Sequence, residues 1–235
     1  MVNQELEMYN LMAAIYHSNI PINFKGAMIL HALLYENGYS KDAIRPTQDI
    51  DANWQSDDIP SMEYILKTLQ RVIDDNNIDL TVKSYREYGI GKSAGFKFYN
   101  KSDNVMVFSM DMDVNRPNTG SRIYQVGDLK FRGIIVEQIL ADKISVLSSD
   151  KIFRRIKDFI DLYYLSHCVE INLEKVYEIL ENTNRKLSDF NGFINRKDEL
   201  QHAFEKFRFT GDAEKPDFEN AYNKVYNYVK VFFQK

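Results

Sequence analysis

Apolar and polar positions follow two different periods along the first half of the chain. Three segments place apolar side chains three and four positions apart, which is typical of helices, and "QDIDANW" alternates charged and neutral positions with a period of two, which is typical of a strand. Pro21 and Gly38 interrupt the pattern where an element is expected to end. The predicted elements are, in chain order, helix 5–18, strand 22–24, helix 27–37, loop 38–46, strand 48–54, helix 61–77, strand 80–88, strand 95–99, turn 100–104 and strand 104–114.

From about residue 126 the alternation stops and helical patterns fill most of the remaining chain. The last of them places Tyr222, Val225, Val229 and Phe232 on one apolar stripe. We therefore predict an α+β fold, with a mixed sheet and flanking helices in residues 1–125 and an all-helical domain in residues 126–235. The predicted helices of this second part are 133–149, 151–168, 172–184, 196–207 and 217–233.

Composition limits the classes of protein to which the chain belongs. With 235 residues and 44% hydrophobic content, it has enough apolar side chains for a sizeable core. Its formal net charge of −4, from 30 basic and 34 acidic residues, argues against a protein that binds nucleic acid by bulk positive charge. The one cysteine, Cys168, rules out an intramolecular disulfide and a cysteine-rich zinc site.

Hydropathy along the chain gives no indication of a membrane segment. Every apolar run is much shorter than the ~18 residues of a spanning helix, and the first residues lack the basic stretch and apolar run of a targeting signal. A single cysteine also suits a reducing compartment. We therefore expect a soluble, cytoplasmic protein that does not contact membranes.

Two pairs of aspartates lie on predicted strands. Asp49 and Asp51 share one face of the strand 48–54, where their charges repel each other, and "FSMDMDV" places Asp111 and Asp113 on one face of another strand. Carboxylate oxygens suit Mg²⁺ or Mn²⁺, and such ions relieve the repulsion while they stabilise a triphosphate during displacement. Either Asp111 or Asp113 would serve as the third ligand or as the base that activates an acceptor hydroxyl.

Three further features are compatible with phosphate chemistry and with ordinary structure alike. Gly26 precedes a helix, so that backbone N–H groups can approach a phosphate. In "VEQILADKISVL", Lys143 lies beside an apolar stripe, from which it reaches either water or a phosphate. In "FRRIKDFIDLYYL", Asp158 and Asp161 share a helix face, and their i,i+4 pairs with Arg154 and Lys157 are each worth about 0.3–0.5 kcal/mol.

The order of four motifs adds a resemblance. "KGAMIL", "RPTQDID", "ILADKISVL" and "RRIKDFIDLYYL", spread over residues 24–165, resemble the AbiEii/AbiGii family of bacterial nucleotidyltransferase-like proteins, within the DNA polymerase β-type nucleotidyltransferase superfamily. Many members are toxins of toxin–antitoxin or phage abortive-infection systems. The resemblance implies a nucleotidyltransferase-type domain in residues 1–125, a helical domain that contributes to the active-site cleft, and metal-dependent transfer of a nucleoside monophosphate from an NTP to an acceptor.

The resemblance also implies roles for individual residues. Asp113 is preferred to Asp111 as the third acidic residue, because its Asp-Val ending matches the family's strand better. The implied metal ligands are Asp49, Asp51 and Asp113. The implied catalytic residues are these three with Lys143 and Asp158, the latter positioned by Arg155, Lys157 and Asp161. The implied nucleotide-binding residues are Lys25, Gly26, Ala27, Arg45, Thr47, Lys143, Arg155 and Lys157.

The phosphate turn departs from the family pattern. The family usually has Gly-Gly or Gly-Ser there, often followed by threonine, whereas this chain has Gly26, Ala27 and Met28. A hydroxyl is therefore missing, although the N–H of Ala27 is available. This departure keeps open a second hypothesis, a nucleotide-binding module of weakened activity that acts through a protein partner. A purely structural scaffold with incidental acidic residues is a third.

The acceptor of the transferred group is not identified by the sequence. Basic residues near the junction of the two halves would line a cleft for RNA or form a solvated rim. A tRNA acceptor end is the preferred hypothesis and a protein hydroxyl the second, with an antitoxin as a further partner. These basic residues are Arg116, Arg122, Lys130, Arg132, Lys151, Arg154 and Arg155.

Overall fold

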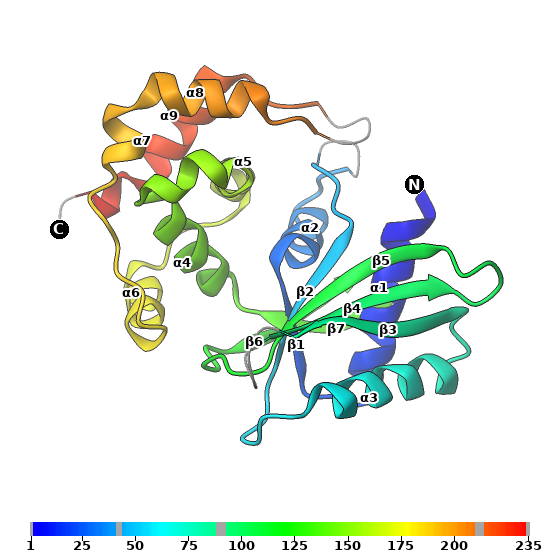
Figure 1. The fold of residues 1–235 in the computed structure, drawn as a ribbon. Coiled ribbons are helices and arrows are strands. Elements are labelled where there is room, and N and C mark those ends of the chain that lie inside the picture. The colour runs from blue at the N-terminus through cyan, green and yellow to red at the C-terminus, as the bar shows by residue number, and fades with distance from the viewer. Residues whose placement is uncertain (1, 41–43, 88–92, 210–213, 234–235) are drawn as a thin grey trace. The chain divides into compact units, whose positions relative to one another are not determined.

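A computed structural model describes residues 2–40, 44–87, 93–209 and 214–233 of the chain. It divides into two compact units, coloured along the chain in Figure 1. Unit 1 comprises Met1–Glu36 and Thr47–Ile135, and unit 2 comprises Asn37–Pro46 and Val136–Lys235. Among the described residues, no helix is both long enough and apolar enough to cross a membrane.

Unit 1 is a mixed sheet with helices, as the sequence predicts. Within the described residues its strands follow the order β3-β4-β5-β2-β1-β7-β6, with parallel pairing only of β1 to β7 and of β2 to β5. Tyr88, the end of the predicted strand 80–88, and residues 41–43 of the predicted loop lie outside the described residues. The elements are α1 (Val2–His17), β1 (Ile22–Lys25), α2 (Gly26–Glu36), β2 (Asp49–Trp54), α3 (Met62–Asp75), β3 (Leu80–Glu87), β4 (Ser93–Asn100), β5 (Met106–Asp113), β6 (Ser121–Val126) and β7 (Leu129–Ile134).

Helices α1 and α2 cover the same face of the sheet. The ring of Phe24 on β1 lies 6.4 Å from that of Phe131 on β7, and Tyr9 of α1 stacks on Phe131 at 5.3 Å. Gly133 is the Cα partner of Phe24, and a Cβ built on Gly133 would meet Ile29 of α2 at 2.4 Å. Helix α3 contacts α1. The apolar side chains of the strands are buried toward these helices, which leaves the polar side chains on the opposite face.

The hairpin of β6 and β7 is an element that the sequence analysis missed. Val126 and Leu129 are Cα partners, so the turn consists of two residues, one of which is Gly127 with a φ of +58°. Tyr124 and Phe131 are fully buried on the helix-covered face. The alternation of β7 is hard to recognise because Gly133 stands where the next inward side chain would be. Residues from 133 are therefore predicted to begin a helix.

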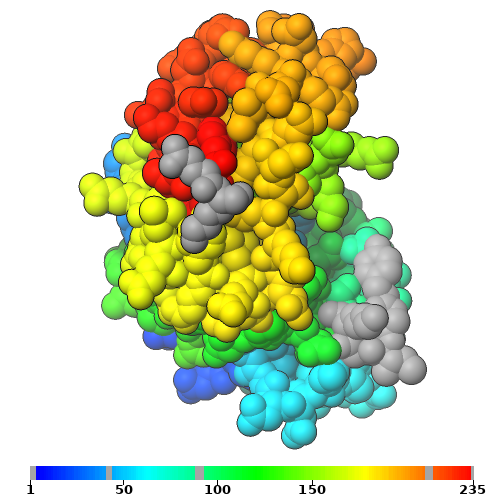
Figure 2. Space-filling view, turned by 90° about the vertical axis from the view of Figure 1, so that its left-hand side faces the viewer, coloured from blue at the N-terminus to red at the C-terminus, as the bar shows by residue number. Residues whose placement is uncertain are grey.

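Unit 2 is helical throughout its described elements, as the sequence predicts. The predicted helix 151–168 is interrupted at Arg155, whose φ of −120° and ψ of 39° are not helical. Phe159 lies at the centre of the core, 6.2 Å from Phe193 and 6.0 Å from Phe204 between ring centroids. Residues from α6 to α9, yellow to red, form a continuous surface in Figure 2. The elements are α4 (Val136–Leu147), η2 (Asp150–Arg154), α5 (Ile156–Cys168), α6 (Leu173–Asn182), α7 (Asn191–Asn195), α8 (Lys197–Lys206), α9 (Phe218–Val229) and η3 (Lys230–Phe232).

The two units differ in two places from the ranges expected from the sequence, 1–125 and 126–235. The β6–β7 hairpin pairs with β1, so the sheet unit extends to Ile135. The segment Asn37–Pro46, which connects α2 to β2, groups with the helical unit although it lies in the N-terminal half. The spacing of hydrophobic residues along the sequence predicts neither feature.

Candidate active site

The polar face of the unit 1 sheet carries the acidic residues, which we name the acidic face: Asp49, Asp51, Asp111 and Asp113. Asp51 on β2 is the Cα partner of Lys25 on β1 and of Asp111 on β5. Side chains of partnered residues point to the same face, so these three form a row across the sheet. Asp49 and Asp113 share that face two positions along their strands.

Gly26 brings the start of α2 against the acidic face. Its φ is +68°, a conformation that glycine adopts without steric cost. A Cβ built at this position would lie 2.3 Å from Oδ2 of Asp51. The absence of a side chain therefore lets the N-terminus of α2, with its positive dipole and N–H groups that have no acceptor within the helix, lie beside this carboxylate, with Ala27 next in the helix.

Asp113 is held by two cations of unit 1. Nζ of Lys25 donates to its Oδ2 at 2.7 Å and Nε of Arg116 donates to the same oxygen at 2.9 Å. Burial disfavours the ionised form, but Lys25 and then Arg116 outweigh it and lower the pKa of Asp113 below its ordinary value. Asp113 is therefore a paired carboxylate in this arrangement.

Asp111 is held by residues of β3 that the sequence analysis did not select. Nη2 of Arg86 donates to both carboxylate oxygens at 2.7 Å, and the hydroxyl of Tyr85 donates to Oδ1 at 3.0 Å. Between the strands lies Gly95, where a Cβ would meet the Tyr85 ring at 2.7 Å. A glycine inside a strand pattern is the signal for such a close approach.

The remaining member of the acidic face, Asp49, is exposed at the start of β2. The hydroxyl of Thr47 donates to its Oδ1 at 2.7 Å, which orients the carboxylate at the point where the chain enters the strand. Thr47 therefore contacts the acidic face through Asp49.

The donor chemistry of the acidic face fits Mg²⁺ or Mn²⁺, which prefer carboxylate oxygens. Among the described residues, however, no group of three or more His, Cys, Asp or Glu side chains is placed to hold a metal ion. Asp113 and Asp111 face Lys25 and Arg86 instead. If either aspartate binds a metal ion, the ion therefore has to displace the side-chain cation that pairs with that aspartate.

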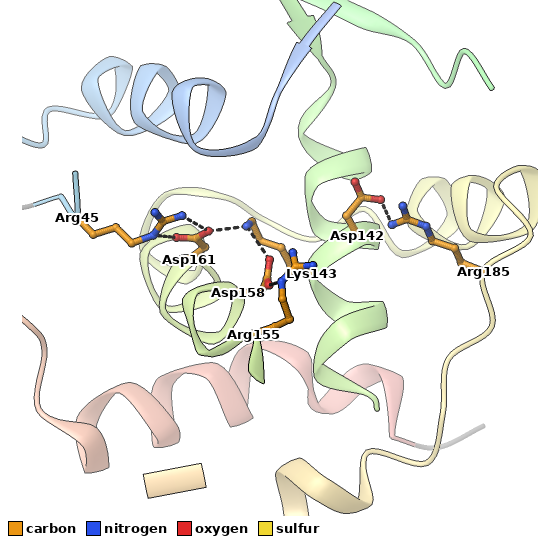
Figure 3. Close-up of polar contacts among 7 residues, drawn as sticks. All are labelled: Arg45, Asp142, Lys143, Arg155, Asp158, Asp161 and Arg185. Carbon is orange, nitrogen blue, oxygen red and sulfur yellow. Dashed lines mark hydrogen bonds and ion pairs between the residues drawn. The ribbon is translucent and has the colours of Figure 1, made fainter. Parts of the chain in front are cut away.

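The sequence-predicted residues of unit 2 form a charge network, shown in Figure 3, in which Arg155 is exposed and the other four are buried: Arg45, Lys143, Arg155, Asp158 and Asp161. Nε and Nη2 of Arg45 donate to the two oxygens of Asp161 at 2.7 and 2.8 Å. Nζ of Lys143 donates to Asp161 at 2.6 Å and to Asp158 at 3.3 Å, and Nε of Arg155 donates to Asp158 at 2.8 Å. The network joins α4, α5 and the segment Asn37–Pro46.

Burial and the neighbouring charges shift the pKa values of the network in opposite directions, and the neighbouring charges have the larger effect. Burial would raise the pKa of Asp161, but the guanidinium of Arg45 and the ammonium of Lys143 hold it well below its usual range. Burial would lower the pKa of Lys143, but Asp161 and Asp158 raise it above the ordinary value. Lys143 is thus a charged ammonium, 7% exposed, whereas Lys157 is exposed on the same helix as the two aspartates.

Removal of the Lys25 charge is expected to change the response of the protein to acid. The pKa of Asp113 is lowered in the folded state, so the stability it contributes is present above its unfolded pKa of about 3.9 and is lost as the pH falls through the folded value. Lys25→Gln removes much of this lowering. Urea unfolding should therefore show a smaller loss of stability below about pH 4 for Lys25→Gln than for the natural protein.

The exposed Lys130→Gln is the matched control, and its loss of stability in acid should equal that of the natural protein. Equal acid responses of Lys25→Gln and the natural protein would show that the Lys25 ammonium does not hold Asp113.

Comparison with known proteins shows the family to which the sequence belongs and the solved structures that its fold resembles. A family model described as "Nucleotidyl transferase AbiEii toxin, Type IV TA system" matches residues 10–224. The chain is similar to the solved structure of MenT4, a nucleotidyltransferase toxin from Mycobacterium tuberculosis, with a TM-score of 0.60 and 14% identity over 99% of this chain and 83% of that one. The structure of the antibiotic-resistance factor ANT(2'')-Ia matches with a TM-score of 0.45 and 14% identity over 88% of this chain and 99% of that one. A search of curated protein sequences finds no match.

Proposed function

Because the chain belongs to the family of AbiEii nucleotidyl transferase toxins of type IV toxin–antitoxin systems, we propose that its acidic face supports metal-dependent transfer of a nucleoside monophosphate. Family membership makes the protein an enzyme of the nucleotidyltransferase class, with a nucleotide substrate and an antitoxin partner. The observation that carries the proposal is the close approach of Asp51 to Gly26, where an added Cβ would lie 2.3 Å from Oδ2, so that a carboxylate of the acidic face lies beside the N-terminus of α2.

In the proposed reaction an acceptor hydroxyl attacks the α-phosphorus of an NTP. The new bond joins the acceptor oxygen to phosphorus, the bond from phosphorus to the bridging oxygen breaks, and pyrophosphate leaves. Asp49 and Asp51 would hold the metal with Asp113 or Asp111, and the carboxylate that is not a ligand would take the hydroxyl proton. When bound, Mg²⁺ or Mn²⁺ neutralises phosphate charge and stabilises the attacking and leaving oxygens.

The other residues of the site would bind and orient the nucleotide. The N–H groups after Gly26, beginning with Ala27, would donate hydrogen bonds to a phosphate, and Lys25 would donate to a phosphate oxygen in place of Asp113. The ammonium of Lys143 would offset the negative charge of the phosphates, and Asp158 would orient the Lys143 side chain. Arg45 and Thr47 would position the start of strand β2, and Arg155 and Lys157 would add positive charge at the start of α5.

Labelled nucleotides test this proposal. Purified protein with Mg²⁺, cell extract and each NTP labelled at the α-phosphate should transfer label to a macromolecule, and EDTA should stop the transfer. Label at the γ-phosphate should not be transferred, because it leaves with pyrophosphate. Ribonuclease or protease treatment of the product then distinguishes a tRNA acceptor, which we propose, from a protein hydroxyl.

Three results would contradict the proposal. Absence of α-label transfer with all four NTPs would refute the enzyme assignment, and transfer of γ-label would indicate a phosphotransferase. NTP binding without transfer, with toxicity that survives Asp51→Ala, would favour the nucleotide-binding module that acts through a partner.

A further inference from the structure

The pair of Arg45 and Asp161 is more buried than most ion pairs. Asp161 is 1% exposed and Arg45 is 9% exposed. At such depth the cost of removing charges from water offsets much of their attraction, and apolar residues of similar volume often replace these pairs without loss of stability. What the pair does supply is geometry, because a guanidinium and a carboxylate joined by two parallel hydrogen bonds have one relative orientation.

Asp161 holds two groups at once. Its Oδ2 accepts from Nη2 of Arg45 at 2.8 Å and from Nζ of Lys143 at 2.6 Å, and its Oδ1 accepts from Nε of Arg45 at 2.7 Å. Figure 3 shows Asp161 between the two cations. A change at Asp161 therefore removes a partner of both Lys143 and Arg45.

Arg45 lies on the segment that connects α2 to β2. This segment, Asn37–Pro46, groups with unit 2, whereas β2 belongs to unit 1 and begins at Asp49, four residues after Arg45. The guanidinium thus fixes the chain shortly before it enters the acidic strand. Thr47, which donates to Asp49, lies between these two points.

We propose that Asp161 is a positioning residue for nucleotidyl transfer, which holds Lys143 directly and, through Arg45, the chain that leads into the acidic strand. This inference rests on the proposed function. In this inference Arg45 acts through its ion pair with Asp161 and does not contact the nucleotide. Neither Arg45 nor Asp161 then needs to touch substrate for its loss to lower the rate.

The positioning role predicts that the losses at Arg45 and Asp161 are not additive. Asp161→Asn keeps the size of the side chain and is expected to lower kcat/KM for transfer by about 10- to 100-fold, the usual effect of losing a residue that orients a site group. Arg45→Gln should lower it as well, and the double variant should lose no more than Asp161→Asn alone. Arg45→Lys should recover part of the Arg45→Gln loss.

Asp142→Asn is the matched control, because Asp142 on α4 also pairs with an arginine, Arg185, as Figure 3 shows. It should leave transfer unchanged. Hydrogen exchange of the backbone N–H groups within residues 44–48, which Pro46 lacks, gives a second readout, and Asp161→Asn should accelerate it at least tenfold more than Asp142→Asn. If Asp161→Asn does not fold, Arg45→Gln carries the exchange measurement, and the recovery of transfer by Arg45→Lys tests the role in catalysis.

Two outcomes would overturn the inference. Losses at Arg45 and Asp161 that multiply in the double variant would show that Arg45 acts on the nucleotide independently. Equal exchange at residues 44–48 in Asp161→Asn and Asp142→Asn would show that Asp161 does not hold the segment, whether or not transfer is detected. A natural protein that transfers no nucleotide would refute the proposed function, and the exchange measurement would still decide the contact.

Discussion

Asp51→Asn is expected to lower nucleotidyl transfer by at least about 10³-fold, since a bound metal supplies several kcal/mol of charge stabilisation and each 1.4 kcal/mol is a factor of ten. Asp51 is the member of the acidic face that touches Gly26 and is the Cα partner of both Lys25 and Asp111. The substitution keeps the size of the side chain and removes its charge. The assay is transfer of α-labelled NTP at saturating Mg²⁺.

Asp128→Asn is the control for this prediction, because Asp128 is an exposed acid of the same unit in the β6–β7 turn. It should transfer label at the natural rate. Activity of Asp51→Asn within threefold of the control would remove the acidic face from the reaction, provided that both variants unfold at similar temperatures.

Gly26→Ala is expected to lower transfer by about 10²-fold, because displacement of a site group by about 1 Å costs that much. A Cβ at Gly26 would lie 2.3 Å from Oδ2 and 3.0 Å from Cβ of Asp51, so the aspartate has to move. The φ of +68° adds a backbone cost of roughly 1–2 kcal/mol to the free energy of folding.

Gly127→Ala separates the two effects. Gly127 also has a positive φ, +58°, but a Cβ there meets nothing within 4 Å. In urea unfolding both variants should show the backbone cost, with a further loss for Gly26→Ala because Asp51 has to move, whereas only Gly26→Ala should lose transfer activity. Equal activities of the two variants would mean that the fit of Gly26 against Asp51 has no part in catalysis.

Local patterns predicted the elements of the sheet that carry the acidic face. The alternation of "QDIDANW" and "FSMDMDV" placed Asp49 with Asp51 and Asp111 with Asp113, and the structure joins these strands as parallel neighbours. The period of two fixes which residues share a face, but strand order depends on contacts between distant segments. The contact of Arg86 with Asp111 therefore had no counterpart in the sequence analysis.

The roles predicted for the lysines and Arg45 depended on the resemblance, and the structure adds partners that spacing does not reveal. Nζ of Lys143 lies between two carboxylates, and the Arg45 guanidinium faces Asp161, which is 116 positions away in the chain. Long-range ion pairs leave no periodic signal. The roles of the lysines and of Arg45 in nucleotide binding stay predictions.

The most direct test is a crystal structure of the protein with Mg²⁺ and a non-hydrolysable NTP. Our account predicts a metal ion bound by Asp49 and Asp51, triphosphate oxygens at the N–H groups that follow Gly26, and Lys25 turned from Asp113 toward the phosphates. A nucleotide bound elsewhere, with Asp49 and Asp51 free of metal and Lys25 still paired with Asp113, would contradict it.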